Sequence, residues 1–325
     1  MIPTTSTNKI LGHERQIAYL DRVRERGTLA HAYLFHGPEQ VGKRAVAVEW
    51  IKTLFCQNGK KKISDPCSGC ASCRQIEDGT HRNVMRLSLE QTLVSKKEER
   101  KDIPIDDIRE VIRLLSYAPA AGEWRVVLID QAERMNDEAS NAFLKLLEEP
   151  GEQTLIILIA PSAELVLSTI ASRSQQIAFS LAPDSVLENA LAQKKINPEV
   201  RKTLLALAGG RPGVLVKFLA DPDRLAREQK LFEETLAVVE RGSVPEVFDL
   251  VGRIVPDEHR RVQCMRYVFG LLRHGLAASA ATGTNTPAII NRIKKTDRIA
   301  TLMQTTNVNP RLALDVFFLT AKGLV

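Results

Sequence analysis

One short glycine-containing segment limits the possible folds of this chain more than any other feature. Residues Gly37–Lys43 read GPEQVGK and match the phosphate-loop pattern GxxxxGK. An apolar run at Ala32–Phe35, typical of a buried strand, precedes the segment, and a helical pattern at Arg44–Phe55 follows it. In that context the loop N–H groups and the helix N-terminus face a phosphate, and the lysine reaches the outer phosphates. The sequence therefore predicts a P-loop fold.

Two positions near this loop argue against ATP hydrolysis. Arg44 stands where a working loop carries Ser or Thr, whose hydroxyl binds Mg²⁺. Asp130 ends an apolar strand as a metal-side carboxylate should, but Gln131 follows it, where ATPases of this class usually have a glutamate. Glutamine can orient a water molecule and cannot take its proton. We expect that the loop either is kept as a scaffold and binds no nucleotide, or binds nucleotide without hydrolysing it. The candidate nucleotide-binding residues are Gly37, Gly42, Lys43 and Asp130.

The rest of the chain alternates strand-like and helix-like segments up to about residue 180. Further buried strands are predicted at Val84–Leu87, Trp124–Asp130 and Leu155–Ala160, with helices between them. This alternation calls for a parallel sheet covered on both faces. From Pro183 onward strand-like runs disappear. The sequence then predicts a small helical unit to about residue 221, where DPD marks a candidate linker, and a second helical region to the end.

Four of the five cysteines lie close together in the sequence. Cys56, Cys67, Cys70 and Cys73 follow the spacing C-x10-C-x2-C-x2-C. Four thiolates are enough for a closed tetrahedral Zn²⁺ site with no open position, which is the structural type. An iron–sulfur cluster is the main alternative, although no Cys-Pro closes the run as it does in bacterial ferredoxins. Cys264 stands apart among apolar neighbours and is expected to be a buried structural thiol.

Composition excludes some functions and leaves others open. The chain has no apolar run near the roughly 18 residues needed to span a bilayer. Its start, MIPTTSTNKI, lacks the basic and apolar regions of a secretory signal, so we expect a cytoplasmic protein with no membrane role. A net charge of +6 over 325 residues permits contact with nucleic acid without requiring it.

Five features occur in a fixed order within residues 1–220. They are HAYLF at His31–Phe35, the four-cysteine insert, GTH at Gly79–His81, IDQAERMN at Ile129–Asn136 and NAFLKLLEEP at Asn141–Pro150. As an ordered set they resemble the delta-prime subunit family of the bacterial DNA polymerase III clamp loader, with gamma/tau as the near relative. The resemblance implies an α/β P-loop domain of the AAA+ type at residues 1–180 with a zinc insert at 56–73, a helical lid at 181–221 and an all-α collar and oligomerisation domain at 222–325.

The resemblance also implies a role for one arginine. In that family an SRC motif follows the strand after the NALLKxLEEP helix, and its arginine reaches the ATP held by a neighbouring subunit. The matching segment here is Ser172–Ser174, which reads SRS and keeps Arg173. We therefore expect Arg173 to act as an arginine finger in trans. A surface salt bridge is the alternative role for this residue.

Two departures favour delta-prime over gamma. Residues 160–162 read APS, where hydrolysing subunits have Thr-Thr, and Gly209–Gly213 lacks the gamma-type sensor arginine at its usual offset. The function implied by the resemblance is a subunit that does not hydrolyse ATP and helps load the sliding clamp onto primed DNA. Its partners would be gamma/tau, delta, the clamp and primer-template DNA. The alternatives are an active gamma-like ATPase and a zinc-containing DNA-binding protein.

Overall fold

The computed structural model describes residues 10–63, 65, 67, 69–91, 93, 101–116, 123–194, 196–282 and 286–325. Residues 1–9, which carry the argument about a secretory signal, lie outside the described residues. The chain divides into two compact units, the first ending at Val186 and the second beginning at Leu187. No helix in the described ranges is both long and apolar enough to cross a membrane.

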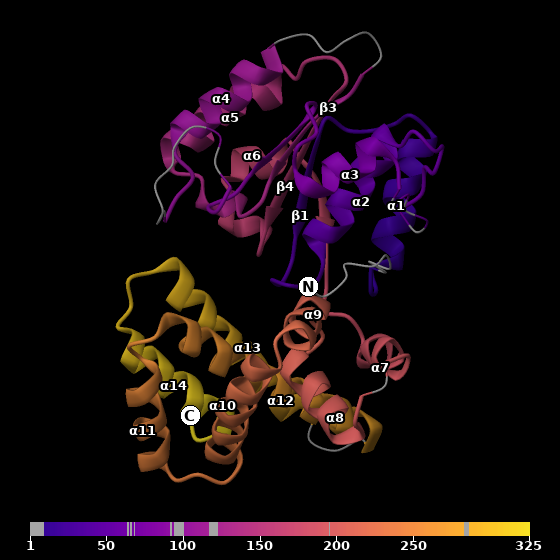
Figure 1. Cartoon of the computed structure of the whole chain (residues 1–325). Helices are drawn as coiled ribbons and strands as arrows, with labels where there is room; N and C mark the ends of the chain where they lie inside the picture. The colour runs from indigo at the N-terminus through magenta and orange to yellow at the C-terminus, as the bar shows by residue number, and fades with distance from the viewer. Residues whose placement is uncertain are drawn as a thin grey trace. The chain divides into compact units, whose positions relative to one another are not determined.

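The first unit contains a five-stranded sheet in which every pair of neighbouring strands is parallel (Figure 1). The strands lie in the order β2-β3-β4-β1-β5. Their bounds are Ala32–His36 for β1, Val84–Leu87 for β2, Arg125–Ile129 for β3, Thr154–Ala160 for β4 and Gln175–Ala178 for β5. This confirms the predicted α/β class with a parallel sheet.

Helices cover both faces of the sheet, as Figure 1 shows. One face carries α1 (Glu14–Glu25), α2 (Lys43–Phe55) and α3 (Ala71–Asp78), and the other carries α4 (Ile105–Ser116), α5 (Asp137–Glu148) and α6 (Ser168–Ser172). Two short 3-10 helices, η1 (Ala132–Arg134) and η2 (Ala163–Leu165), follow β3 and β4.

The two cores of this unit follow from the alternation of side chains along each strand. Tyr33 and Phe35 of β1 point to one face and pack with Trp50 of α2, with ring centroids 4.8 and 6.2 Å away. Leu34 points to the other face and joins the core that contains Phe143 of α5. A parallel strand buried on both faces is apolar at every position, so the apolar runs predicted these strands well.

The structure adds two elements that the sequence pattern did not predict. β5 is only four residues long and lies at the sheet edge, where Gln175 and Gln176 are exposed. An edge strand with polar side chains lacks the apolar run by which a buried strand is recognised. The helix α3 begins within the cysteine insert and extends to Asp78, in a region that the sequence analysis interpreted only by its cysteine spacing.

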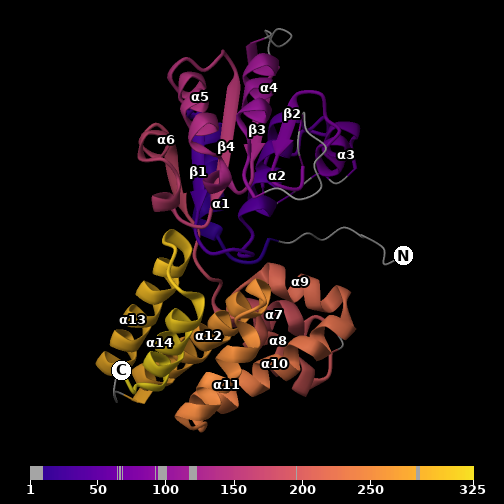
Figure 2. The ribbon, with the colours of Figure 1, turned by 90° about the vertical axis from the view of Figure 1, so that its left-hand side faces the viewer.

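All the regular elements of the second unit are helices in its described residues. Its helices are α7 (Asp184–Ala192), in which the unit boundary falls, α8 (Pro198–Ala208), α9 (Pro212–Ala220), α10 (Pro222–Glu240), α11 (Val244–Ile254), α12 (Glu258–Thr282), α13 (Thr286–Thr305) and α14 (Pro310–Lys322). Figure 2 gives a second view of these helices. As predicted, Cys264 is buried. The Asn309 side chain caps α14.

The connection between α9 and α10 is the single residue Asp221, so Pro222 and Asp223 of the predicted DPD linker belong to α10. α9 ends at Ala220, and the Asp221 side chain accepts a hydrogen bond from the Arg224 N–H and caps α10. The helix α10 packs against α8 and α9 as well as against α11, α12 and α14. The division of this region into a lid at 181–221 and a collar at 222–325 stays a prediction.

Candidate nucleotide site and metal centre

The phosphate loop begins where three strands end. Gly37 follows β1 with φ 137°, and its N–H donates to the Pro161 carbonyl just beyond β4 at 3.1 Å. A Cβ atom at Gly37 would lie 2.0 Å from the carbonyl oxygen of Phe179, which follows β5. Because no side chain fits there, the first glycine of the motif is required by the packing of the loop as well as by its turn.

Lys43 is the first residue of α2 and is buried, with 6% of its surface exposed. Its ammonium group donates to the carbonyls of Gly37 and Pro38, the latter at 2.8 Å. Burial lowers the pKa of Lys43, an effect that the Asp130 carboxylate opposes. The lysine of the motif is therefore turned into the loop and binds its backbone carbonyls.

His13, which the sequence analysis did not single out, contacts the same loop. His13 precedes α1 in a left-handed conformation (φ 68°), and its Nε2 lies 2.9 Å from the Val41 carbonyl oxygen. Its ring also contacts the Phe179 ring at a centroid distance of 4.9 Å. A histidine 28 residues before its partner gives no local signal, so only the fold reveals this contact.

Asp130 lies at the carboxyl end of β3, as predicted, and it is paired with Arg44. The closest oxygen and nitrogen of the two side chains are 3.7 Å apart, and the Asp130 side chain is 25% exposed. Its other carboxylate oxygen accepts the N–H of Gln131 at 3.0 Å. Burial raises the pKa of Asp130, and the Arg44 guanidinium is the strongest influence in the opposite direction.

Gln131 has a left-handed backbone (φ 58°), which turns the chain out of β3. Its side-chain oxygen accepts a hydrogen bond from the N–H of Leu89 at 3.4 Å. The amide is thus held by the loop after β2. At this position the chain offers neither a carboxylate base nor a free amide oxygen.

The four cysteines of the insert come together in space. Cys56 ends α2, Cys70 caps the start of α3, Cys73 lies in its first turn, and Cys67 lies in the loop before them. Their sulfur atoms all lie within 4.8 Å of one another. A tetrahedral Zn²⁺ ion with Zn–S bonds of about 2.3 Å would place its sulfurs about 3.8 Å apart. The donor set and its geometry therefore fit a closed four-thiolate metal site.

Local hydrogen bonds favour the thiolate form of Cys67, whereas burial raises the pKa of the Cys56 and Cys73 thiols. The backbone N–H groups of Gly69 and Cys70 lower the pKa of the Cys67 thiol to about 6. The Asn58 side-chain amide donates to the same sulfur at 3.2 Å. Each N–H stabilises negative charge on sulfur before a metal binds.

The insert is attached to the rest of the unit by buried polar contacts. The Ile63 N–H donates to the Asp21 carboxylate of α1 at 3.1 Å. Lys52 of α2 is buried and donates to Glu49 at 2.8 Å and to Glu77 of α3. The helix α2 thus runs from the phosphate loop to the metal cluster and carries one side of the insert.

Arg173 ends α6 at the surface of the first unit. Its guanidinium donates to the Glu148 carboxylate of α5 at 2.9 Å and to the Thr169 carbonyl at 3.3 Å, and its side chain is 40% exposed. Within the part of the chain that the structure describes, these contacts do not include Lys43 or Asp130. Arg173 is therefore held in place but is not part of its own chain's loop.

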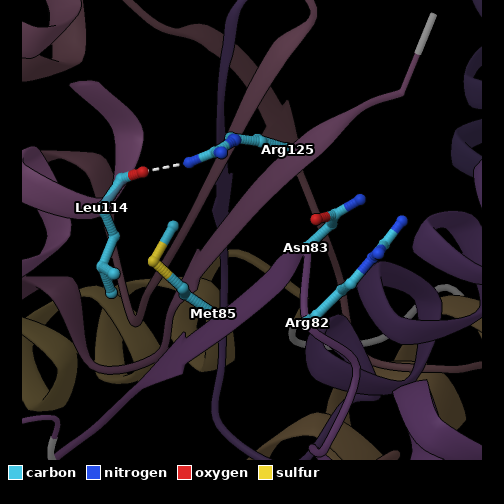
Figure 3. A pocket seen from close by; sticks show the side chains of 5 residues that line it. All are labelled: Arg82, Asn83, Met85, Leu114 and Arg125. Carbon is cyan, nitrogen blue, oxygen red and sulfur yellow. Dashed lines mark hydrogen bonds between the residues drawn. The ribbon is translucent and has the colours of Figure 1, made fainter. Parts of the chain in front are cut away.

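A separate cavity of about 240 Å³ lies near the start of β2 and β3, the sheet edge opposite to the loop. Its lining residues are Arg82, Asn83, Met85, Leu114 and Arg125 (Figure 3). Figure 3 shows the Arg125 guanidinium donating to the Leu114 carbonyl. Arg82 and Asn83 each donate to Glu123 at 2.7 Å. None of the predicted site residues lines this cavity.

The known proteins to which this chain is similar include several subunits of DNA polymerase III. The chain is 37% identical over 189 residues to DNA polymerase III subunit delta′ of Pseudomonas aeruginosa. This aligned region covers 58% of this chain and 55% of the relative. The chain is 26% identical over 215 residues to subunit delta′ of Bacillus subtilis, covering 66% and 59%. It is also 32% identical over 219 residues to subunit tau of Escherichia coli, covering 66% of this chain and 32% of that one. The matched part thus spans just over half the length of the delta′ relatives.

A family model covers the whole P-loop domain. The model of DNA polymerase III, delta subunit, matches residues 12–183, which is more than half of the chain. The matched range contains the loop, the cysteine cluster, Asp130 and Arg173. The chain therefore belongs to the DNA polymerase III delta subunit family.

Proposed function

We propose that this chain is a delta-prime subunit of a bacterial DNA polymerase III clamp loader that does not hydrolyse ATP itself. It acts in the cytoplasm with gamma/tau and delta and helps place the sliding clamp on primer-template DNA. A collar at residues 222–325, which follows a helical lid at 181–221, joins it to the ring of subunits. The observation that carries this proposal is the pairing of Arg44 with Asp130 at 3.7 Å, in a chain of this family. The pair puts a protein cation where a P-loop ATPase binds Mg²⁺.

Assembly is the direct test of the proposal. The purified chain should co-purify with gamma/tau and delta as one complex, and a complex lacking it should load clamps poorly. Alone, it should show no ATP turnover. Mg²⁺-dependent turnover that Lys43→Ala abolishes would instead identify an active gamma-like ATPase. Tight DNA binding without partners, with a steep salt dependence, would favour a separate DNA-binding protein.

Arg173 is proposed to serve the ATP site of a neighbouring subunit. Its guanidinium is at the surface and is oriented by two contacts, from Glu148 and Thr169, so a phosphate could exchange for the exposed carboxylate at little cost. An arginine in this role stabilises the charge that develops on the transferred phosphoryl group, an effect of about 10³ to 10⁵ in rate where it has been analysed.

Replacing Arg173 tests this role. Arg173→Ala in the reconstituted loader should slow ATP turnover at the neighbouring site by at least about a hundredfold, while assembly stays intact. Arg173→Lys should recover only part of the rate, because an ammonium lacks the bidentate geometry of a guanidinium. The matched control is Arg82→Ala, since Arg82 is also exposed and paired with a carboxylate, Glu123, at 2.7 Å. Equal loading rates for Arg173→Ala and the wild-type chain would refute the finger role.

The metal is proposed to be a structural Zn²⁺ held by Cys56, Cys67, Cys70 and Cys73. Four thiolates and no open position suit zinc and leave no place for a substrate. Metal analysis of the purified chain should find about one zinc ion per chain and no iron. Stoichiometric iron with the visible absorption of a cluster would identify an iron–sulfur centre instead.

A further inference from the structure

The neighbours of Asp130 do not fit a divalent metal ion. Mg²⁺ binds six oxygens at about 2.0–2.1 Å, and in a P-loop protein one of them comes from the hydroxyl that follows the lysine. Arg44 occupies that position in the first turn of α2 and has no oxygen to offer. Its guanidinium approaches the Asp130 carboxylate to 3.7 Å.

The positive charge near Asp130 comes from protein side chains, whereas in a working loop a bound metal would supply it. The carboxylate is mostly buried, and Arg44 and Lys43 are the two cations that act on it, whereas Glu90 acts against it. Lys43 is already engaged with the Gly37 and Pro38 carbonyls. Arg44 therefore remains as the cation that faces the carboxylate. A guanidinium keeps its charge at every physiological pH, so this cation is permanent.

We propose that the Arg44 guanidinium takes the place of Mg²⁺ beside Asp130 and is the residue that excludes a divalent cation from this loop. The inference depends on the proposed function only in treating residues 37–43 as a nucleotide loop. It differs from simple loss of a ligand, because a missing hydroxyl leaves a space that water and a metal can fill, whereas a guanidinium places a bulky cation beside the carboxylate. Restoring the hydroxyl should then restore the metal.

The test compares ATP affinity in Mg²⁺ with ATP affinity in EDTA, measured by titration calorimetry on the full chain. The wild-type chain should show no gain from Mg²⁺. Arg44→Thr should bind ATP about tenfold or more tightly in Mg²⁺ than in EDTA, the scale on which single metal-site contacts act. Arg44→Lys keeps a cation and should behave as the wild type, and Arg44→Thr with Asp130→Asn should lose the gain.

Two results would overturn the proposal. One is tighter ATP binding by the wild-type chain in Mg²⁺, since the metal would then enter despite Arg44. The other is an Arg44→Thr chain that is folded, by circular dichroism and thermal melting, and gains nothing from Mg²⁺. Either result leaves assembly with gamma/tau and delta untouched, so the failure of this inference is distinguishable from the failure of the proposed function.

Discussion

Asp130 carries a negative charge in surroundings that disfavour it. Its side chain is mostly buried at the end of β3, and burial raises its pKa above the ordinary value of 3.8. The compensating partner, Arg44, is half-exposed, so solvent screens much of their attraction. At the scale of residues, a site built for a metal-bound carboxylate thus retains a carboxylate whose charge costs stability.

The sign of this effect can be tested with Asp130→Asn. A carboxyl group whose pKa is raised by folding is held more tightly in its protonated form, so its contribution to stability falls as pH rises above 3.8. Asparagine is neutral throughout. The variant should be more stable than the wild type at pH 7, and the difference should shrink toward zero below pH 3.8.

Urea unfolding at a series of pH values measures this difference. The control is Asp106→Asn, because that carboxylate is 62% exposed and its replacement should change stability little at any pH. A variant at Asp130 that is less stable than the wild type at pH 7 would mean that the pairing with Arg44 outweighs the cost of burial.

At the scale of elements, the loop is held by the ends of strands that are far apart in the sequence. Gly37 follows β1, Pro161 follows β4, and Phe179 follows β5, and their backbones meet at one place. The parallel order of the sheet brings these ends together, since neighbouring parallel strands finish on the same edge. The geometry of the loop therefore depends on the register of three strands.

Gly37→Ala should break this junction. The new Cβ would meet the Phe179 carbonyl oxygen at 2.0 Å, and a backbone cannot yield as a flexible side chain can. We expect a loss of about 2–4 kcal/mol in unfolding free energy, measured with denaturant. The matched control is Gly27→Ala: Gly27 also has positive φ, at 65°, but open space around it, so its cost should be about 1 kcal/mol. Equal losses of unfolding free energy in the two variants would show that the positive φ alone, and not the contact with Phe179, determines the cost.

The cysteine cluster joins two helices. Cys56 ends α2, while Cys70 caps α3 and Cys73 lies within it, and the Lys52–Glu77 contact joins the same helices. The helix α3 has only eight residues, too few to be stable by itself in water. A metal bound to all four sulfurs would hold α3 against α2.

Removing the metal should therefore unfold the insert first. A chelator, or Cys73→Ser, should abolish protection of the α3 amides in hydrogen exchange and lower global stability by several kcal/mol. Cys264→Ser is the control, because Cys264 lies outside the cluster and should leave the metal content unchanged. Full amide protection of α3 in a metal-free chain would contradict a structural role for the ion.

At the scale of the whole molecule, the two units have separate cores. The sheet unit has one apolar core on each face of its sheet, and the helical unit packs around Phe317 and Phe318 of α14 together with Val268 of α12. Phe317 contacts Phe269 and Phe318 with ring centroids 5.6 and 5.5 Å away. Each unit has the buried apolar cluster that a domain needs to fold alone.

Separate cores predict separate unfolding transitions. Phe317→Ala should destabilise the helical unit by about 3–5 kcal/mol and shift one calorimetric transition of the full chain, while Gly37→Ala shifts the other. The cysteine variants should act on the same transition as Gly37→Ala, because the insert belongs to the sheet unit. A single transition that every one of these variants shifts would mean that the units unfold together.

Much of the fold and of the candidate site could be predicted from local patterns. The strand Val84–Leu87 has the bounds that its apolar run indicates, and Asn136 and Asn309 cap the helices that follow them. The convergence of the four cysteines follows from their spacing. Each of these features depends on neighbours within about 18 residues, which is the range over which sequence periodicity and turn chemistry carry information.

Other features were decided only by the tertiary structure. Several contacts join residues that are 25 to 142 positions apart in the sequence. They are the contact of His13 with Val41, the approach of Phe179 to Gly37, the hydrogen bond from Leu89 to Gln131 and the pairing of Arg173 with Glu148. Their partners are set by strand order and register, which no local pattern specifies.

The Arg44–Asp130 pair shows which features the sequence determines and which depend on the tertiary structure. The sequence by itself determined that this chain has a phosphate loop, a four-thiol cluster and an arginine in place of the metal-binding hydroxyl. Only the packing of α2 beside the end of β3 decided that this arginine faces the carboxylate left without its metal. A side chain's chemistry is local, whereas the charge that it meets depends on which distant elements the fold brings beside it.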